Sequence, residues 1–120
     1  MKIFNKRIGK LGEDIATKFL KKSGYEIIKR NYTNEYGEID IIAAHDGYLI
    51  FVEVKTRSSD EFGLPSEAVD AHKRRKISQV ASCYIHSKHL YDYPVRFDVV
   101  EVCDGKVNHI ENAFDSYLRY

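Results

Sequence analysis

Two carboxylates and a lysine are the residues of this sequence whose types and spacing could do chemistry. They lie on either side of Asp46-Gly47, a dipeptide that favours a type I′ turn between two antiparallel strands. Counting outward from that turn predicts Asp40 opposite Glu53, with Lys55 two residues further along the same face. Opposed residues have Cβ atoms about 5 Å apart, so the two carboxylates repel unless a cation lies between them. The hairpin therefore predicts a divalent metal site.

Phosphodiester hydrolysis is the chemistry that this set favours. Mg²⁺ binds one or two carboxylates and completes its shell with water and substrate phosphate, so Asp40 and Glu53 suffice as anchors. Lys55 could stabilise the charge that develops on phosphorus or help to deprotonate a metal-bound water. The alternative is a surface hairpin whose charged side chains form solvated cross-strand pairs, each stabilising by only a few tenths of a kcal/mol.

The elements that must position these residues follow from the spacing of the apolar side chains. The sequence predicts a helix over 6–23 ended by Gly24, a strand over 25–32, the acidic hairpin, a loop over 58–65, a helix over 67–87, and strands over 95–102 and 107–110. Because a strand, helix, strand crossover is right-handed, the strand after the second helix should lie parallel to a neighbour. The expected fold class is α/β, a mixed sheet flanked by helices in the order α-β-β-β-α-β-β-α, within a single domain over residues 1–120.

The charge of the chain is unevenly distributed, although its net value is only +1. Residues 35–71, which contain the hairpin, hold 2 basic and 9 acidic side chains. They are flanked by residues 1–34, with 9 basic and 3 acidic, and by residues 72–88, with 5 basic and no acidic. If both basic segments fold onto one side, they could grip phosphates while the acidic middle holds the metal. For several lysines of the first helix, the alternative is the solvated face of an amphipathic helix.

The candidate nucleic-acid-binding residues are Arg57, Lys73, Arg74, Arg75 and Lys76. The last four form one basic cluster in the second predicted helix. Its alternative interpretation is also a solvated face.

A longer set of residues resembles a known family. The residues that carry the resemblance are Gly12-Glu13-Asp14, Gly24-Tyr25, Arg30-Asn31-Tyr32, Gly37-Glu38-Ile39-Asp40, Phe51-Val52-Glu53-Val54-Lys55-Thr56-Arg57 and Arg96-Phe97-Asp98. They resemble the YraN family, small bacterial proteins predicted to be endonucleases and distantly similar to archaeal Holliday junction resolvases. The Asp, then Glu-x-Lys arrangement also resembles the wider PD-(D/E)XK nuclease superfamily.

The resemblance implies a restriction-endonuclease-like fold and a site of four residues. Glu13 would be the acid from the first helix, completing the metal ligands Asp40 and Glu53, and Lys55 would be the catalytic lysine. The implied cofactor is Mg²⁺ or Mn²⁺, and the implied partner is DNA. Similarity to the resolvases suggests a homodimer by analogy.

Several other classes of protein are not expected. A glycine-rich phosphate loop and a Ser, His, Asp arrangement at a nucleophile turn are absent from the sequence, which argues against a nucleotide cofactor and against acyl transfer. The first residues are not followed by a long apolar stretch, so we expect a cytoplasmic protein without a membrane partner. Cys83 and Cys103 lack metal-ligand spacing and fit the role of small buried hydrophobic residues.

The sequence therefore favours a metal-dependent DNA endonuclease that acts on branched or irregular DNA. Its main rival is a nucleic-acid-binding module of a repair or recombination assembly that contributes little chemistry. A purely structural interaction protein is the third possibility, and it leaves the opposed carboxylates unexplained.

Overall fold

The computed structural model describes residues 2–57 and 69–115, and only the backbone of residues 2–8. Its elements are α1 (Lys2–Lys22), β1 (Glu26–Asn34), β2 (Gly37–His45), β3 (Tyr48–Arg57), α3 (Ala71–Lys88), β4 (Val95–Cys103) and β5 (Lys106–Ile110). The predicted fold class is confirmed: two helices flank a mixed sheet of five strands. After β5, residues 111–115 form no helix, so a final helix could only lie on residues outside the described part of the chain. The predicted loop over 58–65 also lies outside it.

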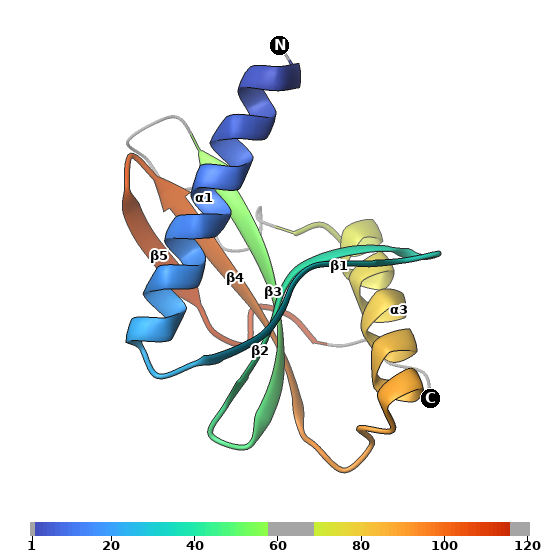
Figure 1. The fold of residues 1–120 in the computed structure, drawn as a ribbon. Helices are drawn as coiled ribbons and strands as arrows, with labels where there is room; N and C mark the ends of the chain where they lie inside the picture. Colours follow the sequence, from blue (N-terminus) through green and yellow to red (C-terminus); the bar gives the residue numbers. More distant parts are fainter. Residues whose placement is uncertain (1, 58–68, 116–120) are drawn as a thin grey trace.

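The five strands lie in the sheet in the order in which they occur along the chain. Three of the four contacts between neighbouring strands are antiparallel, and β3 pairs with β4 in parallel, as the crossover rule predicts. Figure 1 shows α1 and α3 on opposite sides of the sheet. The central strand β3 is thus covered on both faces, which explains its nearly continuous apolar run from Leu49 to Val54. Glu53 is the one charged residue in that run.

Local sequence signals set the ends of the helices and the tight turns. Gly24, with φ of 90°, ends α1 in the left-handed conformation that glycine adopts without strain. The predicted start of the second helix at 67 is wrong, because Asp70 caps α3 by accepting a hydrogen bond from the backbone N–H of Lys73 at 2.9 Å. Asp46 and Gly47 both have positive φ, as a type I′ turn requires, and they set the register of β2 against β3.

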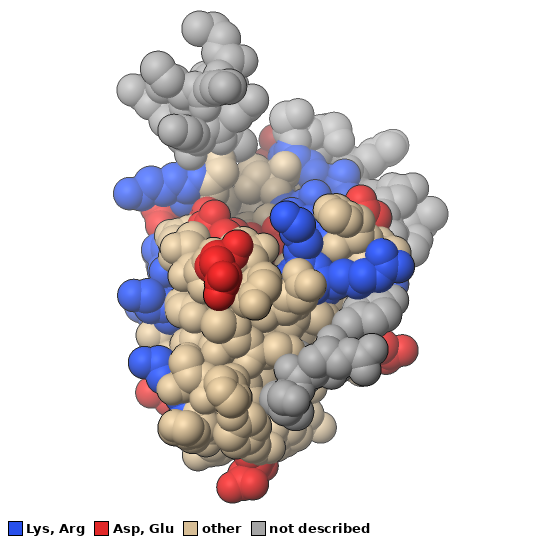
Figure 2. Space-filling view, turned by 90° about the vertical axis from the view of Figure 1, so that its right-hand side faces the viewer, with Lys and Arg blue, Asp and Glu red and all other residues tan. Residues whose placement is uncertain are grey.

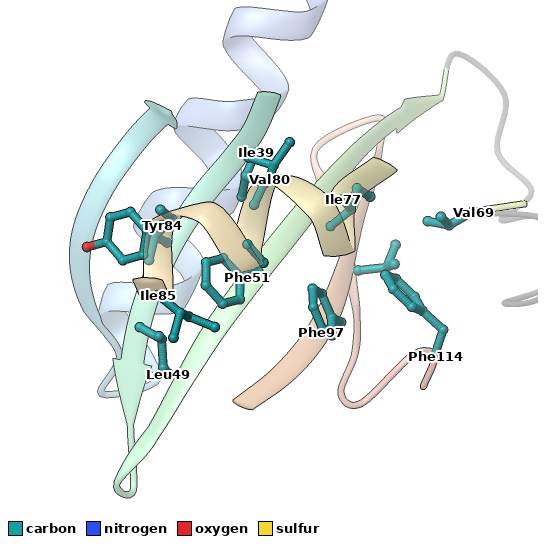
Figure 3. Packing of buried hydrophobic residues seen from close by; sticks show 13 residues of the cluster. Ile39, Leu49, Phe51, Val69, Ile77, Val80, Tyr84, Ile85, Phe97 and Phe114 are labelled. Atoms are coloured by element: carbon teal, nitrogen blue, oxygen red, sulfur yellow. The ribbon is translucent and has the colours of Figure 1, made fainter. Parts of the chain in front are cut away.

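One hydrophobic cluster fills the space between the sheet and α3 (Figure 3). Its buried residues include Ile39, Phe51, Ile77, Val80, Tyr84, Ile85, Phe97 and Phe114. Burying each of the larger side chains stabilises the fold by about 1.5–3 kcal/mol. This packing fixes α3 against β3 and thereby places the first turn of the helix near Glu53.

A second cluster lies between α1 and the other face of the sheet. It contains Ala16, Leu20, Tyr25, Ile41, Ala43, Ile50, Val52, Val100 and Val102. The two clusters show that β2 turns about Asp40. Ile39 packs on the α3 side and Ile41 on the α1 side, although residues two apart on a straight strand share a face. Asp40 therefore lies at the bend, between the two layers.

Candidate functional site

The site begins where β2 and β3 separate. The predicted register holds from His45 opposite Tyr48 to Ile41 opposite Val52. Its continuation to Asp40 opposite Glu53 and Glu38 opposite Lys55 is wrong, because the pairing of β2 with β3 ends at Ile41 and only the pairing with β1 goes on. The pairing ends where the side chains of β2 change faces, between Ile39 and Ile41.

Asp40 and Glu53 nevertheless come together at this divergence. Oδ2 of Asp40 accepts a hydrogen bond of 2.8 Å from the backbone N–H of Val54, which fixes the carboxyl group beside β3. Burial raises the pKa of Asp40 to about 7, and the charge of Glu53 and a side-chain hydrogen bond with it add to the effect. Glu53 is itself buried, with 8% of its surface exposed. Solvated cross-strand pairs, the alternative for this hairpin, do not describe these two carboxylates.

Glu53 also bonds to Lys73 at the start of α3. The distance from Nζ of Lys73 to Oε1 of Glu53 is 2.8 Å. The sequence did not predict this contact, although α3 offered a signal. Its first turn carries basic residues and no acid, the reverse of what a helix N-terminus favours.

Glu13, on α1, lies close enough to Asp40 to affect its ionisation. Its charge contributes to the raised pKa of Asp40. In the amide orientation that satisfies both neighbours, the nitrogen of Asn31 donates to Glu13 at 2.7 Å and to Glu38 at 3.2 Å. NH2 of Arg30 lies 3.9 Å from Glu13. Burial raises the pKa of Glu13, the charge of Arg30 opposes that rise, and the charge of Glu38 adds to it.

Lys55 follows Glu53 on the face of β3 that points toward α3. Val52 and Val54 alternate with these two residues and pack on the α1 side. Lys55 is half-buried and lies beside Glu101 in the parallel register of β3 and β4. No side chain in the described part of the chain forms a hydrogen bond or an ion pair with the Lys55 ammonium group.

The candidate DNA-binding residues differ in their surroundings. Arg57 donates from Nε to the buried carboxylate of Glu101 at 2.8 Å. Arg74 donates to the carbonyl of Val69 at 2.9 Å and lies over the ring of Phe114. Arg75 and Lys76 are exposed on α3. Figure 2 shows acidic side chains in the upper middle of one face of the protein, with Lys and Arg side chains beside them.

A second charged cluster, around Asp98, belongs to the fold. Asp98 accepts two hydrogen bonds from Arg96, at 2.8 and 2.9 Å, one from the backbone N–H of Asn112 at 3.0 Å, and pairs with Nε2 of His109 at 2.8 Å. Arg96 also donates to the hydroxyl of Tyr25 at 2.7 Å. These bonds use the hydrogen-bonding capacity of a fully buried carboxylate and join β4 and β5 to Tyr25, which lies between α1 and β1.

The donor set at the candidate site suits a hard divalent cation. Within residues 2–57 and 69–115, no group of three or more His, Cys, Asp or Glu side chains is arranged to hold a metal ion. Asp40 and Glu53 supply two carboxylates that repel each other, and Mg²⁺ needs only one or two together with water and substrate oxygens. The pair therefore fits such an ion, and Glu13 does not form a three-residue group with it.

Comparison with known proteins identifies the family of this chain. A model of a family described as "Uncharacterised protein family UPF0102" matches residues 12–102, which include Glu13, Asp40, Glu53 and Lys55. The chain belongs to the UPF0102 family. It is 48% identical to the UPF0102 protein of Caldanaerobacter subterraneus over 120 residues, covering 94% of this chain and 98% of the relative. It is 50% identical to that of Clostridium acetobutylicum over 111 residues, covering 92% and 88%.

UPF0102 is the group to which the YraN proteins belong, so the family resemblance found in the sequence is confirmed. The matches cover 98% of the Caldanaerobacter relative and 88% of the Clostridium acetobutylicum relative. No helix among the described residues is long and apolar enough to span a membrane.

The raised pKa of Asp40 leads to a prediction about stability. The folded state holds a proton to a pKa of about 7, whereas an ordinary aspartate has a pKa of 3.8. The contribution of Asp40 to the free energy of unfolding is therefore complete below about pH 4 and is lost as the pH rises through about 7. In chelator, Asp40→Asn should be more stable than the wild type at pH 8, and the difference should shrink toward pH 5. Urea unfolding across this range measures it.

The control for that series is Asp92→Asn, because Asp92 is exposed and pairs with no described side chain. The difference between its free energy of unfolding and that of the wild type should not change with pH. If Asp40→Asn behaved in the same way, the carboxyl group of Asp40 would ionise freely in the folded protein.

Proposed function

We propose that this UPF0102 protein is a metal-dependent endonuclease that hydrolyses phosphodiester bonds in branched or irregular DNA. The observation that carries the proposal is the meeting of the buried Glu53 with the partly buried Asp40 where β2 and β3 separate. Two carboxylates of like charge are costly to bury unless a cation compensates them. Lys55, without an ion-pair partner in the described part of the chain, follows on the same strand face.

In the proposed site, Asp40 and Glu53 hold Mg²⁺ or Mn²⁺. When bound, such an ion activates water and neutralises phosphate charge. The backbone N–H of Val54 holds Asp40 in place, so one oxygen of that carboxyl group is oriented before any ligand binds. Lys55 stabilises the negative charge that grows on the phosphate oxygens during attack. Glu13, which accepts a hydrogen bond from Asn31, would complete or order the shell around the metal.

DNA is the proposed substrate because basic side chains lie near the carboxylates. Arg75 and Lys76 are exposed on the helix that also brings Lys73 to Glu53. Exposed lysine and arginine bind phosphates and release counterions, which gives affinity without reading the base sequence. A protein that reads backbone and shape is suited to branched DNA, and a homodimer would present two such sites.

A second candidate function is a DNA-binding module that does not cut. The observation in its favour is the ion pair between Lys73 and Glu53, because a lysine that permanently neutralised Glu53 would keep a metal out. The raised pKa of Asp40 beside Glu53 favours the enzyme instead, because carboxyl groups with perturbed pKa values cluster at catalytic sites.

The deciding experiment incubates the pure protein with linear, nicked, flapped and four-way-junction DNA in Mg²⁺, in Mn²⁺ and in chelator. We expect metal-dependent cleavage of a branched or flapped DNA by the wild type and none by Glu53→Gln. Glu35→Gln, which removes an exposed acid at the tip between β1 and β2, should cut normally and excludes a contaminating nuclease. Binding to these DNAs without cleavage in either metal would replace the enzyme with the binding module.

A further inference from the structure

The ion pair between Lys73 and Glu53 joins a half-exposed lysine to a buried carboxylate. Lys73 keeps 45% of its side chain exposed, whereas Glu53 keeps 9%. We propose that Lys73 is a displaceable counter-ion, whose ammonium group occupies the place of the divalent cation in the ion-free protein and leaves when the metal binds Glu53. This inference rests on the proposed metal site and gives that site a built-in competitor.

The position of Lys73 on its helix supports this role. Its backbone N–H is the one that binds the Asp70 cap, so Lys73 is the third helical residue of α3. The N-terminal turn carries partial positive charge, which disfavours a cation there. A lysine fixed at such a place and directed at a buried carboxylate is the kind of local conflict that marks functional positions.

The balance of charge supports it as well. Asp40 and Glu53 present two carboxyl groups, and Lys73 supplies one positive charge. Burial lowers the pKa of Lys73, but its hydrogen bond with Glu53 and the charges of Glu53 and Asp40 raise it overall. A divalent ion neutralises both carboxylates and needs an oxygen of Glu53. Two cations that contact the same carboxylate repel each other, so binding of the metal moves the ammonium group away.

Once released, Lys73 is free to contact a phosphate of DNA at the edge of the site. Lys76, three residues further along the same helix, is also exposed. Metal binding would thus convert Lys73 from a partner of Glu53 into a partner of the substrate. The exchange couples the two binding events, because metal bound at Glu53 makes one more cation available to DNA.

Direct measurement of metal affinity tests the competition. Mn²⁺ is titrated calorimetrically into the protein without DNA, using the wild type, Lys73→Gln, Lys73→Arg and Lys76→Gln. Lys76→Gln is the matched control, since it removes the same charge one turn along α3 from an exposed residue. Lys73→Gln should bind Mn²⁺ roughly tenfold more tightly than Lys76→Gln, the factor that corresponds to losing one charge-assisted hydrogen bond. Lys73→Arg, which keeps the cation, should stay close to the wild type.

A second measurement uses the wild-type protein and so does not depend on the folding of any variant. An amine-reactive ester labels lysines, and mass spectrometry compares their rates of modification with and without Mn²⁺. Lys73 should react several-fold faster when Mn²⁺ is present, because its ammonium group has left Glu53. Lys76 should react at the same rate in both conditions.

The possible results separate this inference from the proposed metal site. If Mn²⁺ binds the wild type but Lys73→Gln binds it no better than Lys76→Gln, or more weakly, and labelling of Lys73 does not change, Lys73 holds Glu53 in place and does not compete. If Mn²⁺ gives neither heat nor a shift in melting temperature with any of the four proteins, the metal site itself is wrong and the displacement fails with it.

Discussion

Replacing Lys55 with alanine should slow DNA cleavage by about 10²–10³-fold, the usual loss when one group that stabilises transition-state charge is removed. Lys55 lies two residues beyond Glu53 on the face of β3 toward α3, and no described side chain neutralises it. Affinity for DNA should stay within a few-fold, because the charge is needed most in the transition state and one phosphate contact among many contributes little to binding. Single-turnover cleavage and an equilibrium binding titration measure the two quantities.

The opposite pattern is expected for Lys76→Ala. This variant should cleave normally at saturating DNA, bind DNA more weakly and lower the slope of log affinity against log salt concentration by about 1. The two residues carry the same charge, so their contrasting defects would separate chemistry from binding. Cleavage by Lys55→Ala at the wild-type rate would leave the proposed mechanism without its charge-stabilising group.

Short-range rules predicted much of this fold. Asp46-Gly47 fixed a two-residue turn, and the turn fixed the register of β2 and β3 as far as Ile41 and Val52. The same rules did not predict that the pairing of β2 with β3 ends at Ile41, because strict alternation along a strand assumes that residues two apart share a face. In the folded protein Ile39 packs on the α3 side and Ile41 on the α1 side, which breaks that alternation.

The candidate site divides in a similar way. The proximity of Asp40 and Glu53 followed from spacing along one hairpin, whereas the contact of Glu53 with Lys73 joins residues brought together by the docking of α3 on the sheet. Asn31 was part of the family resemblance, but its place between Glu13 and Glu38 depends on a left-handed backbone with φ of 52°. A sequence pattern with a period of two gives no indication of such an exception.

Arg96-Phe97-Asp98 shows that a motif shared with a family can serve the fold. Asp98 is fully buried, and burial acts to raise its pKa, yet its bonds with His109, Arg96 and the backbone N–H of Asn112 lower it overall. Its ionised form is therefore stabilised by the folded protein. That contribution to stability is present above the ordinary pKa of an aspartate and is lost as the pH falls through the lowered value.

Asp98→Ala should consequently have the largest effect on stability among the substitutions considered. Removing one member of a buried ion pair leaves Arg96 without its carboxylate and costs about 3–5 kcal/mol. For a domain of this size, such a loss lowers the melting temperature by about 10 °C or more. Asp92→Ala, an exposed control, should stay within about 0.5 kcal/mol of the wild type.

Adding Arg96→Met to Asp98→Ala should recover part of the loss, since the unpaired charge is then gone. The single variant Arg96→Met completes the comparison. If the double variant lost as much free energy of unfolding as the two single variants together, Arg96 and Asp98 would stabilise the protein independently of their pairing.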